Sequence, residues 1–494
     1  MKRLFLIIFG ALALASFLLR LTEPDRGSPV PVLYWITQND PVKLETIRRF
    51  EQWLRDNNLP LCEVRIDNVN RDPTKKLAQG LAGVGSDLMD IYSTETEQFA
   101  RSGMLLDVTD AAKRLGYGPD KTYPALRSDL VVDGRQYGFP RNVASSLFWI
   151  NRDTFAAHGL KEPEYIWNWD EFERLGKQFV EAANPPGTRQ RSYFTQLMPP
   201  NFLRRGLGLS IFNETMTRCT LDDPRNAEVM RRLKRWTNDL HLIPTLAEQT
   251  AMTADVGRAG DAWFYLFSTG RYATLYLPRW GLIRLRPLGK LNMRIVIPPT
   301  SGFPNTEFSS GFIAGYAGTK YPEHVQRFQQ FLTSKSFNVL VAESGDSLPP
   351  VPGYVHTEEF MRPPEHPEEW PLADVFAVAA PEFGITICRS PFVPSNVITR
   401  PITGIDSSVI DEVIAGRVEP EDAGRIVAQR VDQEIARNIE HNEPLRAEYE
   451  RLLAVQAQID TLRAAGKKVP AAWITNPFHL IYYQAQGWLE ETSP

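Results

Sequence analysis

The sequence predicts an α/β protein made of two lobes. A chain of 494 residues is too long for one ordinary hydrophobic core. Short apolar strands alternate with amphipathic helices from residue 32 to residue 116, which is typical of a mostly parallel sheet covered by helices. A new pattern begins in "DGRQYGFPRNVASSLFWINRDTF" (residues 133–155). Two α/β lobes joined by more than one extended segment imply a cleft, with a hinge where the chain crosses.

The predicted first lobe begins with the strand "VLYWIT" (residues 32–37). Leu44, Ile47, Phe50 and Leu54 then recur at helical spacing and predict one buried helix face. The strand "CEVRIDNV", the helix "DPTKKLAQGLAG" with its Asp-Pro start and the strand "LMDIY" follow. The next helix opens with Ser-Thr-Glu, so polar groups gather where a strand meets a helix.

The predicted second lobe begins with the strand "SSLFWIN". In the helix "WNWDEFERLGKQFVEAAN", Asn168 can cap the N-terminus, and Asp170 and Glu171 suit its positive end. Two strands are expected in "RYATLYLPRWG" and "MRIVIPPTSG", followed by a strand and helices in "SSGFIAGYAGTKYPEHVQRFQQFLTSKSFNVLVAES". Residues 406–463 are expected to be helical, whereas the aromatic tail after them carries no expectation.

The N-terminus follows the pattern of an export signal. Lys2 and Arg3 precede an apolar run from Leu4 to Leu19, which is shorter than the roughly 20 residues that span a bilayer. The segment at Ala13 resembles a signal-peptidase site, yet the apolar run continues beyond it. For residues 1–24, a cleaved signal peptide and a retained membrane anchor both stay open.

Composition and motifs argue against several function classes. The net charge is only −4 and no Lys/Arg block stands out, so nucleic acid is not expected as a partner. Cys62, Cys219 and Cys388 form neither a disulfide framework nor a metal motif. The histidines show no metal spacing, and neither a nucleophile elbow nor a phosphate loop occurs. We therefore expect no cofactor, metal or catalytic residue, although a carboxylate pair for glycoside cleavage stays open.

Taken in order, several segments resemble the family-1 extracellular solute-binding proteins, the maltose-binding-protein-like receptors of carbohydrate ABC importers. The resemblance extends over most of residues 30–445. It rests on "WITQNDPVKLETIRRFE", "GVGSDLMDIY", "FARSGMLLDVTD", "DGRQYGFPRNVASSLFWINRDTF", "WNWDEFERLGK", "GRYATLYLPRWG" and "GFIAGYAGTKYPEHVQRFQQFLTS". Two features depart from the family pattern: no cysteine is placed for a lipid anchor, and a tail extends beyond about residue 450.

The resemblance implies a two-lobed periplasmic-binding-protein fold of type II, with a cleft between hinged lobes. Lobe 1 would comprise residues 30–140 and 305–350. Lobe 2 would comprise residues 141–304 and 351–445, and residues 446–494 would form a C-terminal extension.

A sugar site needs planar hydrogen-bonding groups and stacked aromatic rings. The resemblance places such groups where the first and third strands meet their helices, on the crossing segments and in the loop "LPRWG", where Trp280 matches a ring that stacks on sugar. The implied ligand-binding residues are Trp35, Thr37, Asn39, Asp40, Ser93, Thr94, Glu95, Asn142, Ser145, Arg279, Trp280, Ser309, Ser310, Gly311 and Asn396. For Trp35 a place in the core, and for Ser93 and Thr94 a simple capping role, are open alternatives.

The expected function is a periplasmic receptor that captures a sugar or oligosaccharide in the cleft and delivers it to the permease subunits of an ABC importer. The inner membrane would be a further partner if the N-terminal segment stays uncleaved. A periplasmic carbohydrate-active enzyme and a membrane-anchored sugar sensor that uses the same cleft are the alternatives.

Overall fold

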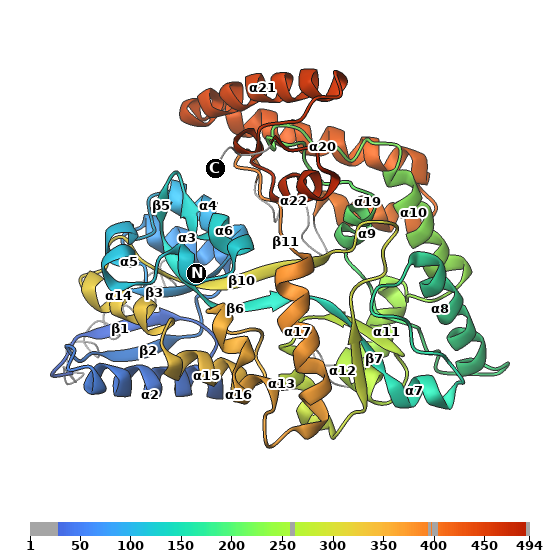
Figure 1. Ribbon diagram of the computed structural model, residues 1–494, viewed down its shortest axis with the longest axis horizontal. Helices are drawn as coiled ribbons and strands as arrows, with labels where there is room; N and C mark the ends of the chain where they lie inside the picture. The colour runs from blue at the N-terminus through green and yellow to red at the C-terminus, as the bar shows by residue number, and fades with distance from the viewer. Residues whose placement is uncertain (1–27, 257–261, 394–396, 398–403, 491–494) are drawn as a thin grey trace, which may run out of the picture.

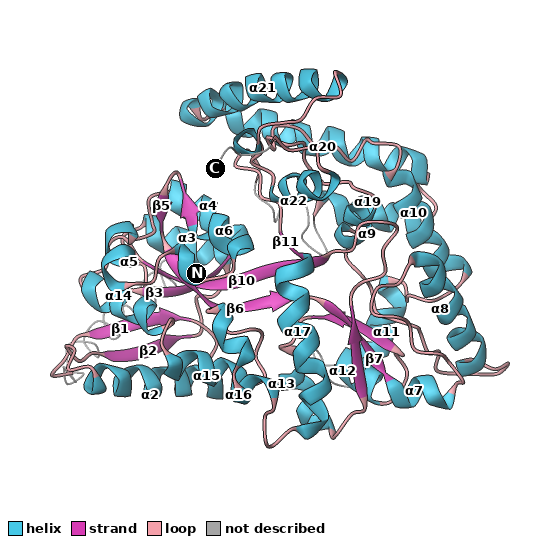
Figure 2. Ribbon diagram, viewed as in Figure 1, coloured by secondary structure: helices cyan, strands magenta, loops and turns pink. Residues whose placement is uncertain are grey.

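The computed structural model describes residues 28–256, 262–393, 397 and 404–490. The predicted signal or anchor segment and Asn396 lie outside this part. Figure 1 shows two lobes side by side and a helical unit above the second one. Strands lie inside each lobe with helices around them, so the α/β class expected from the sequence is confirmed (Figure 2).

Lobe 1 is built around a six-stranded sheet with the order β11-β10-β3-β1-β2, in which β6 also pairs with β10. The first three strands of the chain are parallel, whereas β10 runs antiparallel to β3 and β6. The strands are β1 (Val32–Ile36), β2 (Glu63–Asp67), β3 (Leu88–Tyr92), β6 (Gly138–Ser145), β10 (Thr306–Gly315) and β11 (Gly384–Thr386). Because β1 and β3 are parallel, their carboxyl ends meet at one edge of the sheet.

Helices cover both faces of this sheet. On one face Phe50, Phe328 and Phe337 belong to a core formed with α2, α14 and α15, and on the other Phe99 and Met104 pack near α3 and α4. The helices are α2 (Pro41–Asp56), α3 (Pro73–Leu81), α4 (Ser93–Arg101), α5 (Thr109–Leu115), α6 (Arg127–Leu130), α14 (Pro322–Phe331), α15 (Lys335–Glu343) and α16 (Glu358–Met361), with the hairpin β4 (Val131–Val132) and β5 (Arg135–Gln136).

Lobe 2 contains a three-stranded antiparallel sheet of order β8-β7-β9, namely β7 (Leu147–Asn151), β8 (Thr274–Leu277) and β9 (Met293–Val296). Phe172 and Trp236 pack over one face of this sheet, and Phe264 and Leu282 pack over the other. The helices are α7 (Arg152–Ala157), α8 (Trp169–Ala183), α9 (Asn201–Gly206), α10 (Asn226–Lys234), α11 (Leu246–Val256), α12 (Ala262–Ser268) and α13 (Gly281–Leu285).

The lobes are joined by β6 and β10, which run side by side from one to the other (Figure 1). Helix α17 (Trp370–Phe383) lies across one face of these crossing strands. There Phe376 belongs to the same core as Val143 of β6 and Phe308 of β10. This face is therefore sealed, and the opposite face is the one available to a ligand.

The C-terminal tail folds onto lobe 2. Its elements are α19 (Ile405–Ile414), α20 (Pro420–Glu440), α21 (Glu443–Ala464) and α22 (Pro477–Gln486), which we call the C-terminal unit. Buried Glu214 of lobe 2 accepts hydrogen bonds from Gln456 (2.8 Å), Arg463 (2.7 Å) and Tyr483. Tyr483, one of the aromatic residues that the sequence left unexplained, thus helps Gln456 and Arg463 to fix the tail to lobe 2. In the described part of the chain, no helix has the length and apolar character to cross a membrane.

Candidate ligand-binding cleft

The face of β6 and β10 opposite α17 is partly exposed between the lobes. Ala144, Glu307 and Ser309 have intermediate exposure, whereas Val143 and Phe308 on the α17 side are buried. This is the period of two expected of a strand, whose side chains point alternately to opposite faces. Ala144 pairs with Ser309, so small side chains lie at the middle of the crossing. We call this surface the cleft face.

At the lobe 1 end, the cleft face meets a group of charged residues at the carboxyl edge of the sheet, which we call the edge cluster. It comprises Asp40, Lys43, Asp90, Arg141 and Asp346. Asp90 accepts hydrogen bonds from the Trp35 indole (2.9 Å) and the Thr37 hydroxyl (2.6 Å), and Arg141 approaches it to 3.3 Å. Asp90 lies between apolar neighbours in β3, and alternation turns it toward β1 and Arg141.

Asp346 is the second anchor of the edge cluster. Its carboxylate accepts hydrogen bonds from the Asn142 amide (3.0 Å to each oxygen) and from the Ser347 backbone N–H (2.8 Å). Burial alone would raise the pKa of Asp346, but the charges of Lys43 and Arg141 outweigh it and lower the pKa. Asp346 therefore stays ionised and ties the end of α15 to crossing strand β6.

The pKa values of the two cations in the edge cluster are shifted in opposite directions by their surroundings. Burial, with Arg141 nearby, lowers the pKa of Lys43, although Asp90, Asp346 and Asp40 partly offset this. For Arg141 the desolvation is outweighed by Asp90 and Asp346, which raise its pKa. Opposite charges offset the loss of hydration that a buried charge suffers.

Gly311 provides the room that Arg141 needs. A Cβ atom at Gly311 would lie 2.9 Å from Nε of Arg141 and 3.0 Å from its Cζ. The ladder between β6 and β10 is irregular between Gly311 and Phe312. This β-bulge turns Arg141 onto the cleft face beside Asn142, because an inserted residue changes the alternation of a strand.

At the lobe 2 end of the crossing, the cleft face carries Glu307. Arg205 of α9 lies near it and uses its guanidinium to donate to the carbonyls of Ile385 (3.2 Å) and Thr386 (2.9 Å). Burial raises the pKa of Glu307, and Arg205 only partly offsets this. Burial and the Glu307 charge also raise the pKa of Tyr276, so its ring belongs to the same group.

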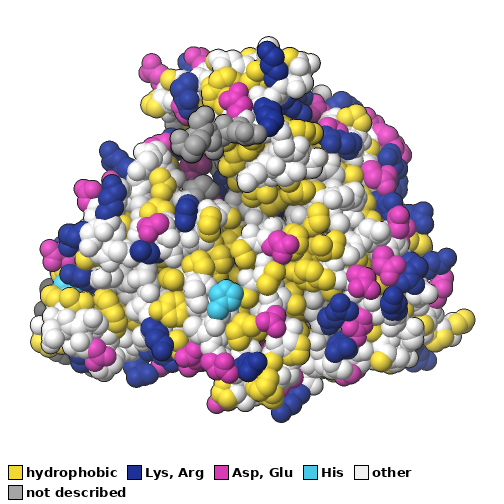
Figure 3. All heavy atoms as spheres, viewed as in Figure 1, with side chains coloured by type: hydrophobic (Ala, Val, Ile, Leu, Met, Phe, Trp, Pro, Cys, Tyr) yellow, Lys and Arg dark blue, Asp and Glu magenta, His cyan; other side chains and the backbone are white. Residues whose placement is uncertain are grey.

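Figure 3 shows the surface hollowed between lobe 1 and the C-terminal unit. A separate group of charged residues lies where α6 of lobe 1 contacts the segment that follows β11. Asp129 of α6 forms an ion pair with Arg389, which follows β11. Burial raises the pKa of Asp129 to about 6, even though Arg389 opposes this shift. Burial likewise raises the pKa of nearby Glu97, which Arg101 and Arg389 counteract. The tyrosine at the end of β3, Tyr92, is 56% exposed.

Three predicted ligand contacts on lobe 1 are buried. The Trp35 ring is 1% exposed and packs edge-on against Phe328, so it lies in the core and positions Asp90. Thr37 is also buried and positions Asp90. Glu95 accepts from the Lys76 ammonium (3.2 Å) and the Tyr92 backbone N–H (3.0 Å), so it closes the start of α4.

Three predicted contacts near the hinge are buried as well. Arg279 is buried and donates to the carbonyls of Asp346 (2.6 Å), Ser347 and Ala342, and burial lowers its pKa to about 10. Arg279 belongs to lobe 2 and these carbonyls belong to lobe 1, so its side chain links the two lobes. Ser145 and Ser310 are buried on the α17 side of the crossing strands, where alternation turns them away from the cleft face.

The structure brings four of the predicted residues together: Asp40, Asn142, Ser309 and Gly311 all lie in or beside the cleft face. Asn39 is exposed directly before Asp40, whose side chain caps α2. Ser93 and Thr94 begin α4 at the same sheet edge. Trp280 is half-buried, and its ring contacts Phe264 of α12 edge-on at 5.9 Å. Its stacking role stays a prediction.

The sequence interpretation missed Asp90, Arg141, Arg205, Glu307 and Asp346. One signal was available, because Asp90 interrupts the apolar strand "LMDIY" and a charged residue inside such a strand needs a partner. No signal of this kind marks Asp346, which lies in a loop far along the chain.

Two surface depressions and one group of possible metal ligands are weaker candidates for a binding site. Two depressions of about 500 and 640 Å³ lie beside α8 and α10, lined by residues such as Trp169, Arg232 and Glu228. His366, Glu368 and Glu369 are close enough to share a metal ion. However, Glu369 already binds Arg286 through two hydrogen bonds of 2.8 and 3.0 Å. The arrangement is that of an ion pair near the protein surface.

The same two-lobed fold occurs in solved solute-binding proteins. An ABC substrate-binding protein of Listeria monocytogenes in complex with cycloalternan is 18% identical, with 82% of this chain and 99% of that chain covered at a TM-score of 0.66. The sugar-binding protein MalE of Xanthomonas citri is 15% identical (82% and 98% covered, TM-score 0.64). UgpB of Mycobacterium tuberculosis in complex with glycerophosphocholine is 16% identical (84% and 100% covered, TM-score 0.64). The chain matches none of the curated proteins with which it was compared.

Two hinged lobes with a polar face between them define a binding protein of the type II periplasmic class. Residues 51–368 match the family described as bacterial extracellular solute-binding protein. The chain belongs to this family, which confirms the expected fold and the expected binding function and places the protein outside the cytoplasm. Its relatives are substrate-binding proteins rather than enzymes.

Proposed function

We propose that the protein captures a sugar or oligosaccharide between its lobes and delivers it to the permease of an ABC importer. The observation that carries this proposal is the cleft face, a partly exposed strip of small and polar side chains with charged groups at both ends. Sugars present many hydroxyl groups, and carboxylates, amides and guanidinium groups are planar partners for them. A ligand that bridges both ends of the cleft face binds the closed state of the lobes more tightly than the open state, and it therefore stabilises the closed state.

Three finer points belong to the same proposal. The ligand leaves the protein chemically unchanged. The protein works in the periplasm, with residues 1–24 as a signal peptide or an anchor in the inner membrane. The lobe boundaries at residues 140–141 and 304–305 are those drawn from the sequence, whereas the boundary drawn at residues 350–351 lies farther along the chain, because α16 lies with lobe 1.

The test is a thermal-shift screen of the purified protein against mono- and oligosaccharides, followed by calorimetry on each hit. A ligand at 100 times its Kd adds about 2.7 kcal/mol of stability by mass action. Mass spectrometry of the recovered ligand then shows whether it is intact. Cleaved products would favour the enzyme alternative, and a complete lack of sugar binding would overturn the proposal.

A matched pair of variants places the site. Ala144→Trp fills the middle of the cleft face and should abolish binding. Ala454→Trp adds the same side chain to an exposed position of α21 and should leave binding unchanged. Equal binding by the two variants would show that the ligand lies elsewhere.

A further inference from the structure

The carboxylates of the cleft differ in how well they are paired. Asp90 accepts two side-chain hydrogen bonds and contacts Arg141, and Asp346 accepts from Asn142 and Ser347. Within the described part of the chain, the Glu307 carboxylate has neither a hydrogen bond nor an ion pair. Among the described residues of this face, Glu307 is thus the acid whose carboxylate is left unpaired.

The nearest cation does not satisfy Glu307. Arg205 is 5% exposed and its two terminal nitrogens donate to backbone carbonyls of β11, which hold the guanidinium in place. Arg205 acts on Glu307 only through space. Moving it to form a direct pair would break both backbone hydrogen bonds, which are stronger than usual because the donor is charged.

The charges around the cleft face leave a negative excess. Asp40, Asp90, Asp346 and Glu307 provide four carboxylates. Lys43, Arg141 and Arg205 provide three cations, and Lys43 is the one whose pKa burial lowers. A carboxylate with little access to water is costly unless a positive charge or several donors compensate it. In number, the lobe 2 end is balanced, because Glu307 has Arg205 near it, but Arg205 forms no ion pair with Glu307 and only partly offsets the effect of burial on its pKa.

We propose that Glu307 binds a positively charged nitrogen of the captured molecule, so that the ligand is a sugar or similar polyol that bears a basic amine. This assignment rests on the proposed sugar-binding function of the cleft. Ser309 and Ala144 leave room beside Glu307 for the ring that carries the amine. Hydroxyl groups farther along the same ligand meet Asn142 and Arg141, and the amine selects the orientation.

The test is calorimetry with pairs of probes that differ only in an amine and a hydroxyl group. Suitable pairs are glucosamine with glucose, galactosamine with galactose, and the β-1,4-disaccharide of glucosamine with cellobiose. At pH 7 we expect at least one amine to bind tenfold or more tightly than its partner. Glu307→Gln should weaken amine binding at least tenfold and change binding of the neutral partner less than threefold. Glu323→Gln, on the exposed side of α14, is the matched control and should change neither.

Acidification provides a second measurement. Protonation of Glu307 removes the charge that the amine pairs with, so the preference of the wild type for the amine should fall as pH is lowered, and the Gln variant should show no such trend. Neutral sugars that bind as well as amines, with no effect of Glu307→Gln, would overturn this assignment and leave the proposed function standing. Failure of the wild type to bind any of these sugars would count against both.

Discussion

Removal of the Asp346 carboxylate should destabilise the protein by about 3–5 kcal/mol, the usual cost of breaking a buried ion pair from one side. In Asp346→Ala, Asn142 loses its acceptor and the cations Lys43 and Arg141 lose one of their carboxylates. Asp346→Asn keeps an acceptor oxygen but not the charge, so about half of this loss is expected. Urea unfolding followed by circular dichroism at pH 7 measures both values.

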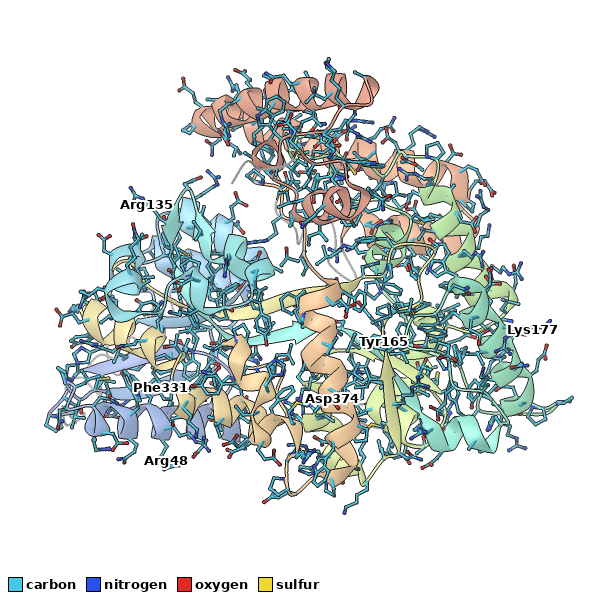
Figure 4. All side chains as sticks on the ribbon, viewed as in Figure 1. Arg48, Arg135, Tyr165, Lys177, Phe331 and Asp374 are labelled. Atoms are coloured by element: carbon cyan, nitrogen blue, oxygen red, sulfur yellow. The ribbon has the colours of Figure 1, made fainter. Side chains whose placement is uncertain are left out.

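The matched control is Asp374→Ala on α17, because Asp374 is exposed (Figure 4) and its change should stay within about 0.5 kcal/mol. The folded pKa of Asp346 is lowered, so its charge stabilises the protein above the unfolded value of about 3.9. That stability is lost as pH falls through the lowered folded pKa, and the difference between wild type and Asp346→Asn should shrink there. A loss under about 1 kcal/mol in Asp346→Ala at pH 7 would refute the pairing described for the edge cluster.

Three further outcomes are expected. The folded pKa of Asp129 is raised to about 6, so the wild type should gain stability over Asp129→Asn as pH falls from 8 to 4, by about 2.5 kcal/mol, in urea unfolding at each pH; a difference that does not vary with pH would contradict this. Gly311→Ala should force Arg141 out of place and weaken ligand binding about tenfold, as measured by calorimetry, and unchanged affinity would show that Arg141 is not needed. Glu214→Ala should cost about 3–5 kcal/mol and loosen the C-terminal unit, seen as faster amide exchange in α22 and not in α2.

Local patterns were sufficient to predict most of lobe 1. The spacing of Phe50 and Leu54 and the Asp-Pro start of α3 depend on nearby residues alone, and the structure confirms them. Leu44, which was expected on the same buried face of α2, is instead 55% exposed, and Lys43 and Thr46 are buried in the first turns of the helix. The expected strand from residue 145 to 151 divides at Ser146 into the end of β6 and β7, because the chain there passes from one sheet to another.

The site was harder to predict because its partners are far apart in the sequence. Trp35 was expected at the ligand, but an indole N–H that reaches Asp90 is satisfied inside the lobe. Arg141 faces Asp90 only because the ladder slips beside Gly311, and no local pattern reveals such a register change. Glu307 looks like an ordinary polar residue of a strand until β10 is known to cross between the lobes.

The attachment of the tail to lobe 2 has a mechanical consequence. The first turns of α21 reach toward lobe 1, where Arg101 of α4 helps Arg451 to lower the pKa of Glu448 (Figure 1). Since Glu214 holds the tail to the other lobe, any rotation about the hinge must sweep this end of α21 past α4. Two fluorophores, one at each of these positions, would convert a small angular change at the hinge into a readable change of separation.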